Sequence, residues 1–172
     1  KAAVYAAYKH QGPVYMRFGR FAVPVINDPE GYEFEIGKAI KVRDCIESEK
    51  KVAIFSTGAI FDEVDEACKV LSEEGIKPTV YTFPTVKPID KDVILECARE
   101  YDTIITVEEH NLSGGFGSAV AEVLSEENNL KAKLVRVALD DRYSCIVGSQ
   151  KYLRKQYSID AQAIIDKVKE NY

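Results

Sequence analysis

Short apolar runs alternate with stretches of helical periodicity along most of this chain. Strand-length runs rich in β-branched and aromatic residues occupy 51–57, 77–83, 102–108 and 132–139, and a shorter run lies near 39–43. Between them, apolar residues recur every three or four positions, which predicts helices over about 58–74, 90–100 and 115–127, with two further short helices at the end of the chain. The pattern is therefore a series of strand–helix units.

The order of these elements predicts an α/β fold with three layers. Strands that alternate with helices of this length pair in parallel, because each helix returns the chain to the same edge of the sheet. The run near 39–43 is followed by another strand without a helix between them, so it is free to run antiparallel. Gly75 is expected to end a helix, and Asp90 is expected to cap the start of the next one.

The N-terminal part has a different pattern. KAAVYAAYKH (1–10) is helical from its first residue, a Gly-Pro turn follows, and Val14–Phe18 has strand character. The segment 19–32 contains prolines and glycines and is typical of a linker. We interpret the beginning of the chain as the last helix and strand of a preceding domain, and the whole chain as a fragment of a longer protein.

Length and charge limit the classes of function. With 172 residues and a formal net charge of −5, the chain fits one domain and lacks the basic excess that nucleic acids or anionic membranes require. No run approaches the ~20 apolar residues of a membrane span, and no secretory pattern is expected. The cysteines are too widely spaced for common metal or disulfide patterns, so reduced thiols and a cytoplasmic protein are expected. They are Cys45, Cys68, Cys97 and Cys145.

The segment TVEEHNLSGGFGSAVAEVL (106–124) combines acids, a histidine and a glycine-rich loop before a helix. Such a loop can cradle phosphate, but a dinucleotide fingerprint starts directly after its strand, and here several residues intervene. A nucleotide-binding module therefore stays open only as an alternative. In the preferred interpretation, Gly115 and Gly117 let the helix begin close to the strand, and Ser113 or Ser118 caps it.

Glu108, Glu109 and His110 end the strand before this loop. Open α/β sheets place functional groups at such strand ends, so these residues are candidates for a site. Neighbouring strand residues point to opposite faces, however, so the two carboxylates are not expected to form an acid/base pair. One is expected to be solvated and the other to bond nearby backbone. His110 has no GxSxG nucleophile and no second ligand at metal spacing to complete a triad or a zinc site.

Four segments in order resemble the C-terminal part of transketolases, in particular of the split, two-subunit kind: GPVYMRFGR, KVAIFSTG, FPTVKPID and TVEEHNLSGGFGSAVAEVL. The resemblance covers essentially the whole chain. Its last two segments are specific to the thiamine-diphosphate transketolase group. It implies a C-terminal domain over residues 35–172, built as a five-stranded mixed sheet with helices on both faces. Residues 1–27 would be the tail of a pyrimidine-binding domain, and residues 28–34 a linker.

For the complete enzyme, the resemblance implies transfer of a two-carbon ketol unit between sugar phosphates, a reaction of the pentose phosphate pathway that uses thiamine diphosphate and Mg²⁺. The residues that hold cofactor and metal are expected outside this chain, so no catalytic, cofactor-binding or metal-binding residue is assigned here. This part would serve assembly and the rim of the site and be inactive alone. Its expected partners are the remaining transketolase domains or an N-terminal subunit, through which a dimer forms.

The resemblance implies one substrate-binding residue. Transketolases use an arginine after the strand that matches GPVYMRF to bind the sugar phosphate, and this arginine corresponds to Arg20. Without the resemblance, Arg20 would be a solvated charge in a linker. Phosphate binding is favoured, because a guanidinium presents a planar fork of donors that suits phosphate oxygens. Arg17, on the strand itself, is expected to pair with a neighbouring carboxylate.

Two departures bear on the choice within the group. Deoxyxylulose-phosphate synthases carry Arg-Phe before Val-Lys-Pro, whereas this chain has Phe-Pro-Thr at residues 83–85. Those enzymes also have YPRG after the strand that matches GPVYMRF, where this chain has FGR. Transketolase is therefore favoured, with those synthases and the β-subunits of 2-oxoacid dehydrogenases as alternatives. In ALDDRYSC (138–145), relatives often have Gly-x-Pro-Asp, so the conformation of this loop is left open.

Overall fold

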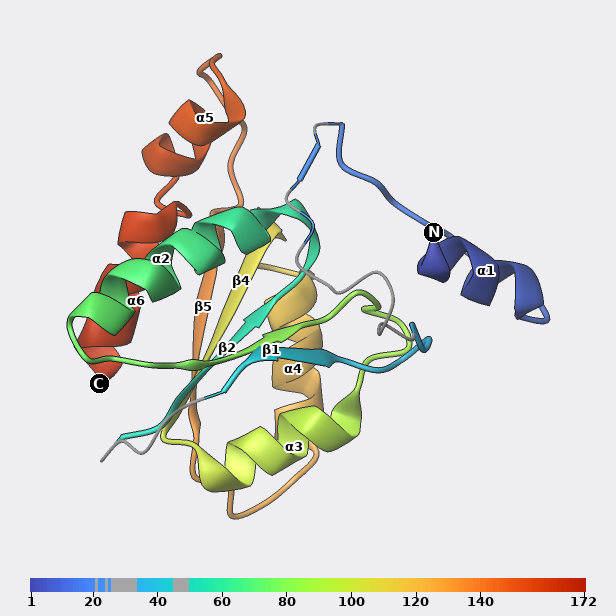
Figure 1. Cartoon of the computed structure of the whole chain (residues 1–172), viewed down its shortest axis with the longest axis horizontal. Coiled ribbons are helices and arrows are strands. Elements are labelled where there is room, and N and C mark those ends of the chain that lie inside the picture. Colours follow the sequence, from blue (N-terminus) through green and yellow to red (C-terminus); the bar gives the residue numbers. More distant parts are fainter. Residues whose placement is uncertain (21, 24, 26–33, 45–49) are drawn as a thin grey trace.

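The computed structural model describes residues 1–20, 22–23, 25, 34–44 and 50–172. At its centre is a five-stranded sheet in the order β1-β3-β2-β4-β5 (Figure 1). The strands are β1 (Ile40–Arg43), β2 (Val52–Ser56), β3 (Thr79–Thr82), β4 (Thr103–Asn111) and β5 (Lys133–Leu139). β1 pairs antiparallel with β3, and all other neighbours are parallel. The predicted three-layer, mostly parallel mixed sheet is confirmed.

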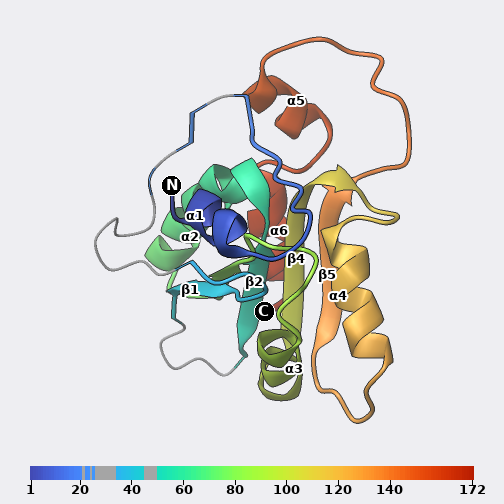
Figure 2. The same ribbon diagram turned by 90° about the vertical axis from the view of Figure 1, so that its right-hand side faces the viewer.

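Helices cover both faces of this sheet (Figure 2). One face carries α2 (Phe61–Glu73) and α6 (Ala161–Asn171), and the other carries α3 (Lys91–Glu100) and α4 (Phe116–Ser125). Two short helices stand apart from these layers in Figure 1, α1 (Ala2–Lys9) and α5 (Gln150–Gln156). Helix α5 lies beyond the end of the sheet at which β4 and β5 finish.

Alternate residues of the central strands supply two separate hydrophobic cores. In β2, Val52 and Ile54 face the cluster under α2 and α6, whereas Ala53 and Phe55 face the cluster under α3 and α4. All four side chains are fully or almost fully buried. A strand buried on both faces reads as a continuous apolar run, which is why KVAIFST lacks alternation.

The predicted helix boundaries are largely confirmed. Gly75 has a φ of 83° just after α2, and its N–H donates to Ser72 while that of Ile76 donates to Leu71, a turn that closes the helix. Asp90 accepts a 3.4 Å hydrogen bond from the Val93 N–H at the start of α3. The helix expected from Gly58 begins instead with a 3₁₀ turn, η1 (Gly58–Ile60), that leads into α2.

One predicted element is wrong. The structure has no strand over Val14–Phe18, although this segment is described. A strand exists only where its backbone pairs with a neighbour, and none of the described strands pairs with this segment. The predicted helix at the start of the chain is confirmed as α1. Most of the predicted linker 28–34 lies outside the described residues.

No helix in the described part of the chain has the length and apolar character needed to cross a membrane.

Candidate functional site

The four parallel strands end at one edge of the sheet, and this carboxyl edge holds the residues singled out from the sequence. The last four residues of strand β4 are Glu108, Glu109, His110 and Asn111. The Asn111 side chain donates a 3.2 Å hydrogen bond to Asp141, in the loop that follows β5. The end of β4 is therefore tied to its neighbour in the sheet.

Glu108 caps helix α4 from the neighbouring strand. Its side chain is buried, and its two carboxylate oxygens accept hydrogen bonds from the N–H groups of Phe116 at 2.6 Å and Gly117 at 2.7 Å. Free N–H groups and the helix dipole make a helix N-terminus a natural place for an anion. Glu108 occupies this place, so the loop has its own carboxylate where a nucleotide phosphate would bind. This contact argues against the nucleotide-binding alternative.

The glycines of the loop allow this close approach, as the sequence predicted. A Cβ on Gly115 would collide with the Glu108 carboxylate, and one on Gly117 would lie 2.6 Å from the Thr106 hydroxyl on β4. The predicted cap by serine is only partly right. Ser118 accepts a 3.0 Å bond from the Gly114 N–H and donates a 2.9 Å bond to Leu112, which stabilises the loop rather than the first turn of the helix.

Replacement of Gly117 by valine is expected to destabilise the domain. The added atoms meet the Thr106 side chain on a central strand, and overpacking of this kind costs about 1–3 kcal/mol. Thermal or denaturant unfolding measures the loss. Glu122→Val, at an exposed position of the same helix, controls for the effect of valine on helix formation. If NAD or ATP raised the melting temperature of the wild type and Gly117→Val abolished that shift with the fold intact, the loop would be a nucleotide site.

Glu109 points to the opposite face from Glu108, as strand geometry predicts, but it is not the solvated residue expected. Its carboxylate accepts a 2.8 Å bond from Nε of Arg154 and a 3.0 Å bond from Gln150, both on α5. Arg154 is buried, with a relative exposure of 3%. The strand end is thereby linked to a helix far along the chain.

Arg154 also bonds the start of α2. One Nη donates to both carboxylate oxygens of Asp62 at 2.8 Å and to Glu63 at 3.2 Å, and the other donates to the Ala59 carbonyl at 3.2 Å. Glu63 in turn accepts a 2.9 Å bond from the Ala161 N–H at the start of α6. We call Arg154, Asp62, Glu63 and Glu109 the Arg154 cluster. It joins β4, α2, α5 and α6.

The charges of this cluster hold the guanidinium in its cationic form. Burial of Arg154 opposes its charge, but the hydrogen bonds to Glu109 and Asp62 outweigh burial and raise its pKa above the ordinary value. A buried guanidinium needs such partners, since an unpaired buried charge is strongly destabilising. The sequence around Arg154 does not indicate that this residue is buried, because its partners lie between 45 and 95 positions away.

The other predicted residues lie apart from this cluster. The His110 ring is exposed, and its Nδ1 lies 3.5 Å from the carbonyl of the adjacent Asn111. Arg20 is exposed and makes no hydrogen bond or ion pair with any residue in the described ranges. The same holds for Arg17, so the predicted carboxylate partner is not found among the described residues.

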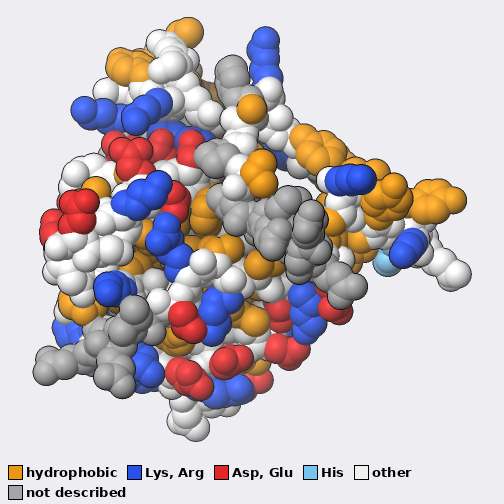
Figure 3. Space-filling view, in the orientation of Figure 1, with side chains coloured by type: hydrophobic (Ala, Val, Ile, Leu, Met, Phe, Trp, Pro, Cys, Tyr) orange, Lys and Arg blue, Asp and Glu red, His pale blue; other side chains and the backbone are white. Residues whose placement is uncertain are grey.

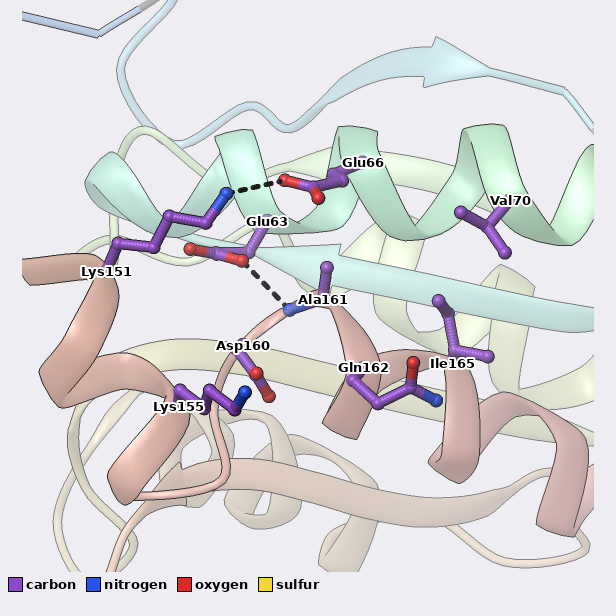
Figure 4. Close-up of a pocket in the computed structure, with 9 residues that line it drawn as sticks. All are labelled: Glu63, Glu66, Val70, Lys151, Lys155, Asp160, Ala161, Gln162 and Ile165. Carbon is purple, nitrogen blue, oxygen red and sulfur yellow. Dashed lines mark hydrogen bonds and ion pairs between the residues drawn. The ribbon is translucent and has the colours of Figure 1, made fainter.

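A pocket and the arrangement of possible metal ligands complete the description of this part of the chain. A pocket of about 270 Å³ between α2, α5 and α6 is lined by charged side chains around Val70 and Ile165 (Figure 4). At its border, Nζ of Lys151 lies 3.6 Å from a carboxylate oxygen of Glu66, and the two side chains form an ion pair. In the residues that the structure describes, no group of three or more His, Cys, Asp or Glu side chains is placed to hold a metal ion.

The two buried thiols stay protonated near neutral pH. Burial raises the pKa of Cys68 to about 11 and that of Cys97 to about 12, so neither forms a thiolate near neutral pH. Both are free, as is the exposed Cys145. The predicted reduced thiols are found at these three positions, and Cys45 lies outside the described residues.

Residues 41–164 match the family model described as "Transketolase, C-terminal domain". The chain belongs to this family. It is similar to one subunit of an apulose-4-phosphate transketolase from Actinobacillus succinogenes, with 34% identity over 160 residues that cover 93% of this chain and 50% of the relative. It is also similar to the 1-deoxy-D-xylulose-5-phosphate synthase of Thermomicrobium roseum, with 38% identity over 157 residues, 90% of this chain and 24% of that protein.

Among solved structures, this transketolase C-terminal domain superposes on one described as "Split gene transketolase, inactive beta4 tetramer", with a TM-score of 0.86 and 35% identity. The match covers 99% of this chain and 53% of that one. The chain thus spans about half the length, or less, of the relatives it matches. The family and the fold inferred from the sequence are both confirmed.

Proposed function

We propose that this transketolase C-terminal domain is part of an enzyme that transfers a two-carbon ketol unit between sugar phosphates. This proposal rests on the match of nearly the whole chain to about half the length of two relatives. One is a subunit of an apulose-4-phosphate transketolase, and the other is described as a split-gene transketolase. The chain would then be the C-terminal part of the enzyme, inactive alone, with the rest supplied by other domains or by an N-terminal subunit.

The proposed role of the chain is assembly and the rim of the substrate site. Every residue of α1 is at least partly exposed, including Tyr8 at 87%, and hydrophobic side chains gather on this projecting helix (Figure 3). An isolated helix shorter than about 12 residues is marginal in water, so α1 needs a surface to pack on. This supports residues 1–27 as the tail of a pyrimidine-binding domain, with 28–34 as a linker and 35–172 as the C-terminal domain.

Thiamine diphosphate and Mg²⁺ would be held by the rest of the enzyme. The described residues do not fit these groups, because Glu108 occupies the N-terminus of α4 and the described acids, histidines and cysteines form no metal-binding cluster. The substrate contact that we assign to this chain is Arg20. Its guanidinium is exposed and unpaired among the described residues, so it is available to a sugar phosphate at the rim.

The principal alternative is a deoxyxylulose-phosphate synthase, since such enzymes are among the relatives. The arginine that those synthases carry before Val-Lys-Pro is absent here. Its place in the sequence is taken by residues 83–85, with the Phe83 side chain buried and the Thr85 hydroxyl accepting a 2.9 Å bond from Gly37. We therefore favour transketolase over the synthase. We also propose that the complete enzyme is cytoplasmic and assembles as a dimer through its other domains.

The choice of reaction is tested with the complete enzyme, this chain together with the half that its relatives possess. We expect kcat/KM for ketol transfer from xylulose 5-phosphate to ribose 5-phosphate to exceed that for condensation of pyruvate with glyceraldehyde 3-phosphate at least about tenfold. The synthase reaction would lack the charge-assisted contact of the missing arginine, and loss of one such contact costs about this factor. Product analysis by mass spectrometry distinguishes the two reactions. A preference for pyruvate would identify the synthase instead.

A further inference from the structure

The segment 140–156 extends from the end of β5 over the carboxyl edge of the sheet, and we call it the cap. Residues 140–149 contain no helix or strand and are all exposed, with Tyr143 and Val147 at 97%. Helix α5 completes the cap, and Arg154 is its one buried residue. In Figure 1 the cap stands away from the layered body of the domain.

Polar contacts attach the cap to the body. Within the described residues, neither hydrophobic core cluster includes a residue of 140–156. The attachments are the Asn111–Asp141 hydrogen bond, the exposed Lys151–Glu66 pair, the Tyr157–Ser144 hydrogen bond, the contact of Arg142 with the Tyr157 ring, the Gln150–Glu109 bond and the Arg154 cluster. Each of the first four involves at least one exposed side chain, and exposed polar pairs contribute little to stability. The Arg154 cluster, in which Arg154 and Glu63 are buried, is therefore the main attachment.

The chain after α5 is built differently. Tyr157 and Ile159 pack with the core under α2 and α6, and Ser158 between them has a φ of 54°. The Tyr157 hydroxyl donates a 2.7 Å bond to Ser144 of the cap. The cap is thus flanked by two fixed points, β5 on one side and the Tyr157–Ile159 turn on the other.

We propose that the cap opens as a unit from the carboxyl edge of the sheet, and that Arg154 is the latch that holds it closed. The groups that face the guanidinium are Asp62 and Glu63 from α2, the Ala59 carbonyl from η1 and Glu109 from β4. Opening withdraws the single cation from three carboxylates and exposes an acidic surface beside the strand ends. The apolar cores stay intact, because the cap contributes nothing to them.

Hydrogen–deuterium exchange of the full chain tests this latch. In Glu109→Gln, which removes one charge from the cluster, backbone amides of 150–156 should exchange about ten- to a hundredfold faster, the range that a lost charge-assisted contact allows. Amides of β2 and β4 should keep their wild-type rates. Glu66→Gln makes the same charge change at the exposed pair with Lys151, and it should leave exchange in the cap unchanged.

Arg154→Met removes every contact of the guanidinium and should increase exchange in the same segment further. Unchanged exchange in the cap of Glu109→Gln would show that the cluster does not hold it, and would overturn the proposal. Equal acceleration in the cap and in β2 and β4 would also overturn it, since the cluster would then belong to the global folding unit. If Arg154→Met fails to fold, the comparison of Glu109→Gln with Glu66→Gln still decides.

Discussion

Replacement of Arg20 by alanine in the complete enzyme is expected to weaken the use of phosphorylated sugars about ten- to a hundredfold. A charge-assisted bond to phosphate contributes about 1.5–3 kcal/mol, which corresponds to this range. The loss should appear mainly in KM, because the phosphate is remote from the reacting carbons and is bound similarly in the ground and transition states. Steady-state kinetics with xylulose 5-phosphate measures it.

An unphosphorylated donor provides the internal comparison for Arg20. Hydroxypyruvate has no phosphate to lose, so its kcat/KM should change little in Arg20→Ala. Arg17→Ala is the matched control, since Arg17 is also exposed and unpaired among the described residues and lies three positions earlier. An equal loss with both donors would mean that Arg20 stabilises the fold or an interface, and the phosphate assignment would be wrong.

The sequence predicted the fold well where the deciding interactions are local or periodic. Burial on both faces explains the apolar run of β2. Hydrogen bonds that span only a few residues explain how Asp90 begins α3 and how Gly75 ends α2. It also predicted that Glu108 and Glu109 diverge, because strand residues alternate between faces. These elements need no knowledge of the distant parts of the chain.

Features that depend on distant partners were not predicted. Val14–Phe18 has the composition of a strand, but a strand also needs a neighbour that pairs with it. Glu109 was expected to be solvated or to bond nearby backbone, whereas its cation is Arg154, 45 positions away. Local rules predicted that a serine caps the N-terminus of α4, but Glu108 on the preceding strand accepts hydrogen bonds from the first N–H groups of this helix. Spacing alone reveals none of these contacts.

The isolated chain is expected neither to bind thiamine diphosphate nor to transfer a ketol unit. Diphosphate binding needs a free helix N-terminus, a basic pocket or a metal held by several carboxylates. In the described residues the N-terminus of α4 is occupied by Glu108, and no cluster of acids, histidines and cysteines could hold a metal. Isothermal titration of the chain with thiamine diphosphate and Mg²⁺ should give only the heat of dilution. A micromolar dissociation constant would contradict this expectation.

Reconstitution is the most direct test of the claim that this chain is one part of a transketolase. Transfer from xylulose 5-phosphate to ribose 5-phosphate is measured while the chain is titrated into a fixed amount of the remaining half of the enzyme from the same organism, with thiamine diphosphate and Mg²⁺ present. We expect no activity from either part alone and a rise in activity that saturates at equal amounts of the two. Activity from the chain alone, or no activity from the mixture, would contradict it.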